Sequence, residues 1–288
     1  MNSHQFNYFP RIFSLHSLLY SLIPTLTTCP EFAKLSVRSG RRADGCGFWG
    51  NANSLTCCQS FMLNKIVDTV EEAIADICDG ASIMVGGFSV AGTPHNLVEA
   101  VSRKGLKNIT LIGNAFTQFL ASTDALGVKK VICTVPLPHA FAWGTGPVDK
   151  GIREGRIEVE LVPQGTLAER IRAGGAGILG FYTPVGVGTL IADGKEQRVL
   201  NGVECLLELP LKADFALIKA DKADRFGNLV YRMAQRNFNP LMATAAKTTI
   251  VEVDEIVPLG NLSPEVVDTP GIYVKRVVKV PKWDIRPH

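Results

Sequence analysis

The feature that most constrains the fold is a glycine-containing loop that lies between an apolar run and a helix signal. Ile83–Val85 is typical of a short buried strand, and the loop Gly86–Gly92 follows it directly. Thr93–Pro94, as N-cap and first helical residue, then predicts a helix that Gly105 ends. Because the apolar strand 109–112 comes next, this order indicates parallel strands joined by crossovers.

Helix and strand signals continue from Met62 to the C-terminus. Asp68 as N-cap, with Glu71 three residues later, predicts a helix that ends at Asp79–Gly80. Residues 62–288 number 227, which is enough for one large domain. We therefore expect a single α/β domain over 62–288, with an open, mostly parallel sheet and helices on both faces.

The second half of this domain repeats the same order of signals. Pro163–Gly165 predicts a turn, and Thr166 with Glu169 predicts a capping box for a helix that ends at Gly174–Gly175. The turn at 224–228 is typical of a hairpin. Strands are expected at 157–162, 178–182, 215–220, 229–232, 249–253 and 272–278.

Residues 1–61 differ in character from the rest of the chain. They are rich in Ser and aromatic residues, carry five Lys or Arg against two acidic residues, and show no lasting helical or strand period. This composition suits an organelle transit peptide, a translated segment upstream of a start at Met62, or a disordered tail. We favour the upstream or disordered interpretation.

Composition excludes several classes of function. A formal net charge of +3 lacks the basic excess of nucleic-acid-binding proteins, so no nucleic acid partner is expected. The sequence contains no run of about 18 apolar residues, so no membrane-spanning helix is expected. Cys78, Cys133 and Cys205 stand singly, without the spacing of a metal site, and we expect buried, inert thiols and no metal.

The loop Gly86–Gly92 is the best local signal for chemistry. Consecutive N–H groups at a helix N-terminus bind anions or a developing oxyanion, and glycines let a ligand approach the backbone. Thr93–Pro94 stands where a phosphate loop needs Lys and Ser or Thr, and Phe88 breaks the GxGxxG pattern of dinucleotide sites. A tight turn without a ligand remains the alternative.

Several segments, taken together, resemble the A subunit of family I coenzyme A transferases, most closely 3-oxoacid and 3-oxoadipate CoA-transferases. The resemblance covers essentially residues 62–288 and is specific because the segments agree in order. They are DG at 79–80 followed by GGFxxxGxP from 86, VPQGTLAERIRAGGAG at 162–177, FYTPVGVGT at 181–189, ADFALIKADKADRFGNLVYR at 213–232, QRNFNP at 235–240 and TPGIYVKRVV at 269–278.

The resemblance implies transfer of CoA from an acyl-CoA, typically succinyl-CoA, to a 3-oxo acid. In that family the nucleophile is a glutamate that the B subunit carries in a Ser-Glu-Asn-Gly type motif, and this chain lacks the motif. The resemblance therefore implies no catalytic residue here, a partner B subunit, a CoA thioester as substrate with no permanently bound cofactor, and a cytoplasmic enzyme. The mitochondrial matrix would apply if 1–61 were a transit peptide.

The resemblance also implies which residues bind CoA. Ser89 stands where relatives usually have glycine, and the segment 113–147 departs from the family pattern. The implied CoA-binding residues are Gly86, Gly87, Phe88, Ser89, Val90, Ala91 and Gly92.

Other candidate residues follow from the residue pattern alone. Glu252, Asp254 and Glu255 alternate with valines, which predicts acids on the wet face of a strand. Lys219, Lys222 and Arg225 are expected at the surface, with contact to CoA phosphates as the alternative. His95 is a candidate ligand contact, and His139 is assigned no role. Two roles are equally compatible with the sequence, shaping the cleft or forming a subunit interface, for four further residues: Arg232, Arg236, Asn237 and Asn239.

Two other functions remain open at this point. The same α/β architecture, related to sugar-phosphate isomerases and sensors, suits a non-catalytic module that binds a phosphorylated ligand. It also suits a self-sufficient isomerase or hydrolase. A co-purifying chain that carries the glutamate motif would favour the transferase.

Overall fold

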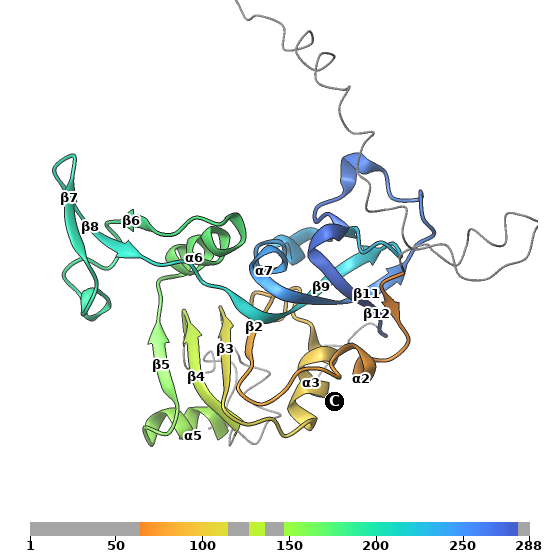
Figure 1. Ribbon diagram of the computed structural model, residues 1–288, viewed down its shortest axis with the longest axis horizontal. Helices are drawn as coiled ribbons and strands as arrows, with labels where there is room; N and C mark the ends of the chain where they lie inside the picture. The colour runs from red at the N-terminus through yellow and green to blue at the C-terminus, as the bar shows by residue number, and fades with distance from the viewer. Residues whose placement is uncertain (1–63, 115–126, 136–146, 282–288) are drawn as a thin grey trace, which may run out of the picture. The chain divides into compact units, whose positions relative to one another are not determined.

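The computed structural model describes residues 64–114, 127–135 and 147–281. In this part of the chain the main sheet has nine strands, and every pair in its continuous order is parallel, which confirms the predicted open, mostly parallel sheet (Figure 1). The order is β1 (Ile66–Val67), β12 (Val274–Lys279), β11 (Ala246–Ile256), β9 (Ala213–Ala223), β2 (Ser82–Val85), β3 (Ile109–Gly113), β4 (Val128–Cys133) and β5 (Glu158–Leu161), with β10 (Leu229–Val230) antiparallel to β9.

Helices cover both faces of the sheet, as the sequence predicts. Along β2, Ile83 packs into the apolar cluster that contains α2 (Val70–Ala73) and α3 (His95–Arg103), while Met84 points to the opposite cluster with α6 (Gln164–Ala176) and α7 (Asn239–Ala245). Figure 1 shows α3 and α6 on opposite sides of the strands. Helix α5 (Pro147–Arg153) precedes β5.

Each predicted strand overlaps a strand of the structure, but 178–182 and 229–232 overlap by only two residues each, and β1, β4, β7 and β8 are not predicted. The central strands are longer than predicted. Strands β9 and β11 each run for 11 residues because both of their faces are covered by apolar side chains. The predicted hairpin at 224–228 is confirmed, since β10 folds back on β9. The Asp224 carboxylate closes it by accepting the N–H groups of Phe226 and Asn228.

The predicted N-terminal helix caps are wrong, whereas the predicted end of α3 at Gly105 is confirmed. Thr69, not Asp68, caps α2, and its hydroxyl accepts the N–H of Glu72, while α2 ends after four residues. The turn predicted at Pro163–Gly165 and the Thr166 capping box are absent, because Pro163 itself precedes a helix that starts at Gln164.

Helix α6 also continues through Gly174–Gly175, where the sequence predicts its end. The reason is close packing, because a Cβ on Gly175 would lie 2.0 Å from the hydroxyl oxygen of Thr244 in α7. The helix ends instead at Gly177, whose φ of +72° is left-handed.

A smaller antiparallel sheet, which no sequence pattern predicts as a unit, extends from one end of the main sheet (Figure 1). Its order is β6 (Phe181–Thr183), β8 (Val203–Glu208) and β7 (Gln197–Leu200). Because all four residues of β7 are exposed, this strand lacks the alternation that predicts half-buried strands. The short 3-10 turns are Leu190–Ala192, Met233–Arg236, Pro264–Val266 and Gly271–Tyr273.

The three cysteines follow the prediction of buried thiols only in part. Cys133 and Cys205 are buried, and burial raises the pKa of the Cys133 thiol to about 12, but Cys78 is exposed in the turn after α2, contrary to prediction. None of the described helices is long and apolar enough to cross a membrane. His139 and the segment 1–61 lie outside the described residues.

Candidate functional site

The loop after β2 lies where the strand order of the sheet reverses. From β2 the chain adds β3, β4 and β5 on one side, whereas the later strands β9, β11 and β12 lie on the other side. In open α/β sheets ligands bind beyond the carboxyl ends of strands at such a point. Because β2 ends at Val85 while β9 continues from Leu217 to Ala223, the loop leaves the sheet beside the free end of β9.

The loop is a narrow, ordered turn. The Gly86 N–H donates to the Leu217 carbonyl at 2.9 Å, which extends the strand by one bond. Phe88 and Ala91 then exchange two main-chain hydrogen bonds of 3.0 Å, and Ser89 and Val90 form the tip between them. Ser89 takes a φ of +55°, which is unusual for a residue with a side chain and is a conformation that glycine adopts readily.

Two glycines of the loop are required by close contacts. Gly87 has a φ of +106°, and a Cβ there would lie 2.3 Å from the Thr93 hydroxyl oxygen and 2.8 Å from its Cα. A Cβ on Gly86 would lie 1.9 Å from the side-chain oxygen of Asn239. A larger residue at either position would force the loop to move.

Two asparagines that follow β10 hold the far half of the loop. Asn237 donates from its side-chain amide to the Ala91 carbonyl at 2.8 Å, and Asn239 donates to the Gly92 carbonyl at 2.9 Å. The Asn239 side-chain oxygen also accepts the main-chain N–H of Lys219 in β9 at 3.2 Å. Of the two roles that the sequence leaves open, these contacts support a role in shaping the cleft.

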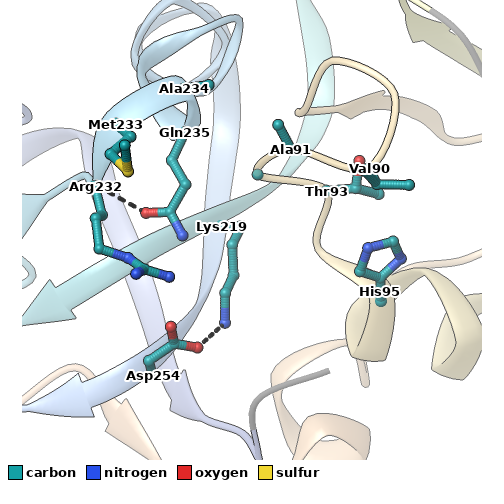
Figure 2. Close-up of a pocket in the computed structure, with 11 residues that line it drawn as sticks. Val90, Ala91, Thr93, His95, Lys219, Arg232, Met233, Ala234, Gln235 and Asp254 are labelled. Carbon is teal, nitrogen blue, oxygen red and sulfur yellow. Dashed lines mark hydrogen bonds and ion pairs between the residues drawn. The ribbon is translucent and has the colours of Figure 1, made fainter. Parts of the chain in front are cut away.

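A cavity of about 310 Å³ opens between the loop and the segment after β10 (Figure 2). Figure 2 shows Arg232 and Lys219 on one wall and Thr93 and His95 on the other. Arg236 instead pairs with Asp268 at 3.0 Å and does not line the cavity. The lining residues are Val90, Ala91, Gly92, Thr93, His95, Lys219, Arg232, Met233, Ala234, Gln235 and Asp254.

Only some of the predicted CoA-binding residues line the cavity. Val90, Ala91 and Gly92 line the cavity, whereas Gly86, Gly87, Phe88 and Ser89 do not. The N–H groups of Gly86, Phe88 and Ala91 are bonded within the protein. Those of Val90 and Gly92 have no acceptor in the ranges that the structure describes. Two residues of the predicted main-chain cradle, Val90 and Gly92, therefore line the cavity and have N–H groups that no described residue accepts, and CoA binding there stays a prediction.

The predicted positions of the acidic and basic residues are partly wrong. Glu252 is 1% exposed and Lys219 is 8% exposed, so neither lies on a wet face. The reason is that β9 and β11 are central strands whose two faces are both covered along their middle residues, and only the strand ends reach solvent. Glu255 is exposed as expected and pairs at 2.9 Å with Lys222, which is half-buried. Arg225 is half-buried, with its guanidinium 5.5 Å from the Phe226 ring centre.

A buried charge cluster lies behind the cavity. The Lys219 ammonium contacts an Asp254 carboxylate oxygen at 2.6 Å and a Glu252 carboxylate oxygen at 3.7 Å. The pairing offsets the cost of burying these charges. Burial, followed by the Lys219 charge, lowers the pKa of His95 to about 4, so the cavity wall presents a neutral imidazole at pH 7.

The chemical resources of the cavity are main-chain N–H donors, a neutral imidazole and charges that are already paired. Such donors stabilise an oxyanion that develops beside them. In the described ranges, His, Cys, Asp and Glu side chains form no group of three that could hold a metal ion. The arrangement therefore favours chemistry that passes through an oxyanion.

The sequence profile described as Coenzyme A transferase matches residues 67–280, which is most of the chain. The chain is 49% identical over 223 residues to the A subunit of the 3-oxoadipate CoA-transferase of Pseudomonas putida, covering 76% of this chain and 95% of that protein. It is 43% identical over 227 residues to the A subunit of the succinyl-CoA:3-ketoacid coenzyme A transferase of Helicobacter pylori, covering 78% of this chain and 96% of that protein.

The fold is also similar to that of a solved enzyme. The glutaconate coenzyme A-transferase of Acidaminococcus fermentans matches with a TM-score of 0.67, covering 75% of this chain and 76% of that chain. At 21% identity this likeness concerns the fold.

Proposed function

We propose that this chain, which belongs to the coenzyme A transferase family, is the A subunit of an enzyme that moves CoA from succinyl-CoA to a 3-oxo acid. The observation that carries the proposal is the glycine loop at the reversal of the strand order, whose Val90 and Gly92 N–H groups are available at a cavity. The names of the two relatives described above both designate A subunits, which supports the need for a separate B subunit.

The proposed reaction passes through a glutamate of the B subunit. A glutamate oxygen attacks the thioester carbonyl, the C–S bond breaks, and CoA leaves as a thiolate from a mixed anhydride. The thiolate then attacks the glutamyl carbonyl and releases the first acid, which leaves CoA on the glutamate as a thioester. The carboxylate of the acceptor acid then attacks the glutamyl thioester and forms a second mixed anhydride as the CoA thiolate leaves. The thiolate attacks the acceptor's carbonyl, which releases the new acyl-CoA and restores the glutamate.

The part of this chain in the reaction is to stabilise each oxyanion and to exclude water. A well-placed main-chain donor lowers such a barrier by about 3 to 4 kcal/mol, and Val90 and Gly92 supply two donors. Val90, which is 45% exposed at the loop tip, presents apolar surface at the cavity. A dry site protects the anhydride from hydrolysis.

The charges at the cavity count against a sensor of phosphorylated ligands. A phosphate site needs cations that are free to pair with it, whereas Lys219 is already matched by Asp254 and Glu252. Arg232 stands at the rim with 61% of its side chain exposed, 3.4 Å from Asp221. This arrangement suits an uncharged thioester arm in the cavity better than a phosphate.

The test is a transfer assay with the full-length chain, alone and with a matching B chain, using succinyl-CoA and a panel of acceptors. We expect no transfer by this chain alone and transfer once the B chain is added. Acetoacetate, 3-oxoadipate and a short fatty acid then identify the acceptor. Transfer by the single chain, or turnover of sugar phosphates by it, would contradict the proposal.

A further inference from the structure

Helix α3 begins without a side-chain cap from its own neighbours, although its first N–H, that of His95, donates to the Thr93 carbonyl at 3.0 Å. Pro94 precedes the helix and offers no side-chain hydrogen bond. The Thr93 hydroxyl, which the sequence predicts as the cap, donates instead to the Ser89 carbonyl at 2.7 Å. The N–H groups of a first helical turn need acceptors from outside the helix, and a buried helix end without them is unfavourable.

The acceptor comes from a strand far away in the sequence. One carboxylate oxygen of Glu252 in β11 accepts the main-chain N–H of Leu97 at 3.0 Å. The other oxygen accepts the side-chain amide of Asn96 at 3.3 Å. A carboxylate at this end of a helix is also favoured by the helix dipole. Glu252 therefore replaces the missing local cap of α3.

The position of Glu252 argues against a role in packing alone. Its side chain is 1% exposed and is surrounded by the covered centre of the sheet, where an apolar residue would avoid the cost of burying a carboxylate. The cost is offset by the N–H donors of α3 and by Lys219, 3.7 Å away. The carboxylate thus joins α3, which follows the glycine loop, to β9 and β11.

Helix α3 and strand β9, which Glu252 joins, both contribute residues to the cavity wall. His95, at the first position of α3, and Lys219 line it, but Glu252 does not. We propose that Glu252 is a positioning residue, which fixes the start of α3 and hence the direction of the loop 86–94 relative to β9. The inference rests on the proposed function, because its effect is measured on the transfer reaction.

The test is Glu252→Gln in the complex with the B chain. The glutamine side-chain oxygen can still accept the Leu97 N–H. Its NH₂ group, however, places a donor opposite the Asn96 amide or the Lys219 ammonium, which are donors themselves. Since a displacement of about 1 Å costs on the order of 100-fold in rate, we expect kcat to fall about 10- to 100-fold. KM for both substrates should stay within about threefold, because Glu252 itself does not line the cavity.

The matched control is Glu255→Gln. This residue lies on the same strand and loses the same charge, but it is exposed and pairs only with Lys222 among the described residues. We expect its kcat to match the wild type. A milder variant, Asn96→Ala, removes one of the donors to Glu252 and should lower kcat in the same direction by less.

Hydrogen exchange gives a readout that does not depend on activity. The Leu97 amide should exchange faster in Glu252→Leu, which removes the acceptor, than in the wild type, and unchanged exchange would overturn the cap itself. An unchanged kcat in folded Glu252→Gln, or KM values that rise as far as kcat falls, would overturn the positioning role. If the wild-type complex transfers no CoA, the proposed function fails, while the exchange measurement still decides whether Glu252 caps α3.

Discussion

The two ends of the main sheet carry the same kind of ion pair in different surroundings. At the carboxyl end, Lys219 and Asp254 pair at 2.6 Å with side chains 10% and 9% exposed. At the amino end, Lys247 and Asp214 pair at 2.8 Å with side chains 81% and 38% exposed. The amino end also has a cavity, of about 430 Å³, which is comparable in size to the one at the carboxyl end.

The difference shows that volume does not identify the site. At the amino end, the Asp214 carboxylate accepts the N–H and hydroxyl of Ser82 as well as the Lys247 ammonium. Its polar groups are therefore satisfied within the protein. At the carboxyl end, the loop leaves the N–H groups of Val90 and Gly92 available at the cavity, which is the resource that a reaction through an oxyanion needs.

The largest effect is expected from Gly87→Ala. Its Cβ would lie 2.3 Å from the Thr93 hydroxyl oxygen, so the loop must move and transfer should fall at least about 100-fold, with the bulkier Gly87→Val at least as severe. The control is Gly105→Ala, which has a similar left-handed φ of +62° but open space around its Cβ. Transfer activity and gel filtration of the complex measure the effect, and equal activity of the two variants would remove the loop from the mechanism.

The two ion pairs should differ strongly when one partner is neutralised. Asp254→Asn leaves the buried Lys219 with Glu252 alone, at 3.7 Å, and we expect a loss of about 2 to 3 kcal/mol in the free energy of unfolding. The melting temperature should fall by roughly 5 to 10 °C. Lys247→Gln breaks the exposed pair and should leave melting unchanged. Equal shifts in a thermal melt would show that burial does not separate the two pairs.

Histidine titration gives the carboxyl end a pH dependence of its own. The pKa of His95 is lowered from 6.5 to about 4 in the folded chain, chiefly by burial. Its contribution to stability is therefore full above pH 6.5 and is lost as pH falls toward 4, by about 3 kcal/mol over the whole window. Urea unfolding at pH 7 and pH 5 should show a smaller loss for His95→Gln than for the wild type. Parallel losses would mean that His95 titrates normally.

The sequence predicts the strands of the fold better than it predicts the burial of the charged residues near the glycine loop. Short apolar runs bounded by glycine and proline locate β2, β3 and β9, because strand signals are local. The prediction for Glu252 is wrong because alternation with valine means a wet face only in a sheet that is covered on one side. Its true environment depends on the register that places it beside Lys219 of β9, a pairing 33 residues apart in sequence that no local pattern reveals.

The remote cap has no local signal in the sequence. The sequence predicts Thr93 as the N-cap of α3, and only the structure shows that its hydroxyl is used inside the loop, so that the buried start of α3 needs an acceptor from elsewhere. The sequence singles out Asn237 and Asn239 without assigning them a role, because their targets are loop carbonyls about 146 residues away. Contacts of this length require the fold to be known first.

The smallest effect is expected at the amino end, in acid. Hydrogen bonds, first from Lys247 and then from Ser82, lower the pKa of Asp214 from 3.8 to about 2. A carboxyl with a lowered pKa stabilises the fold above pH 3.8, and this contribution is lost as pH falls through 2. Asp214→Asn should therefore flatten the fall in melting temperature between pH 4 and pH 2 without changing transfer at pH 7. Because solvent screens this half-exposed pair, a large effect of Asp214→Asn at neutral pH would erase the contrast between the two ends of the sheet.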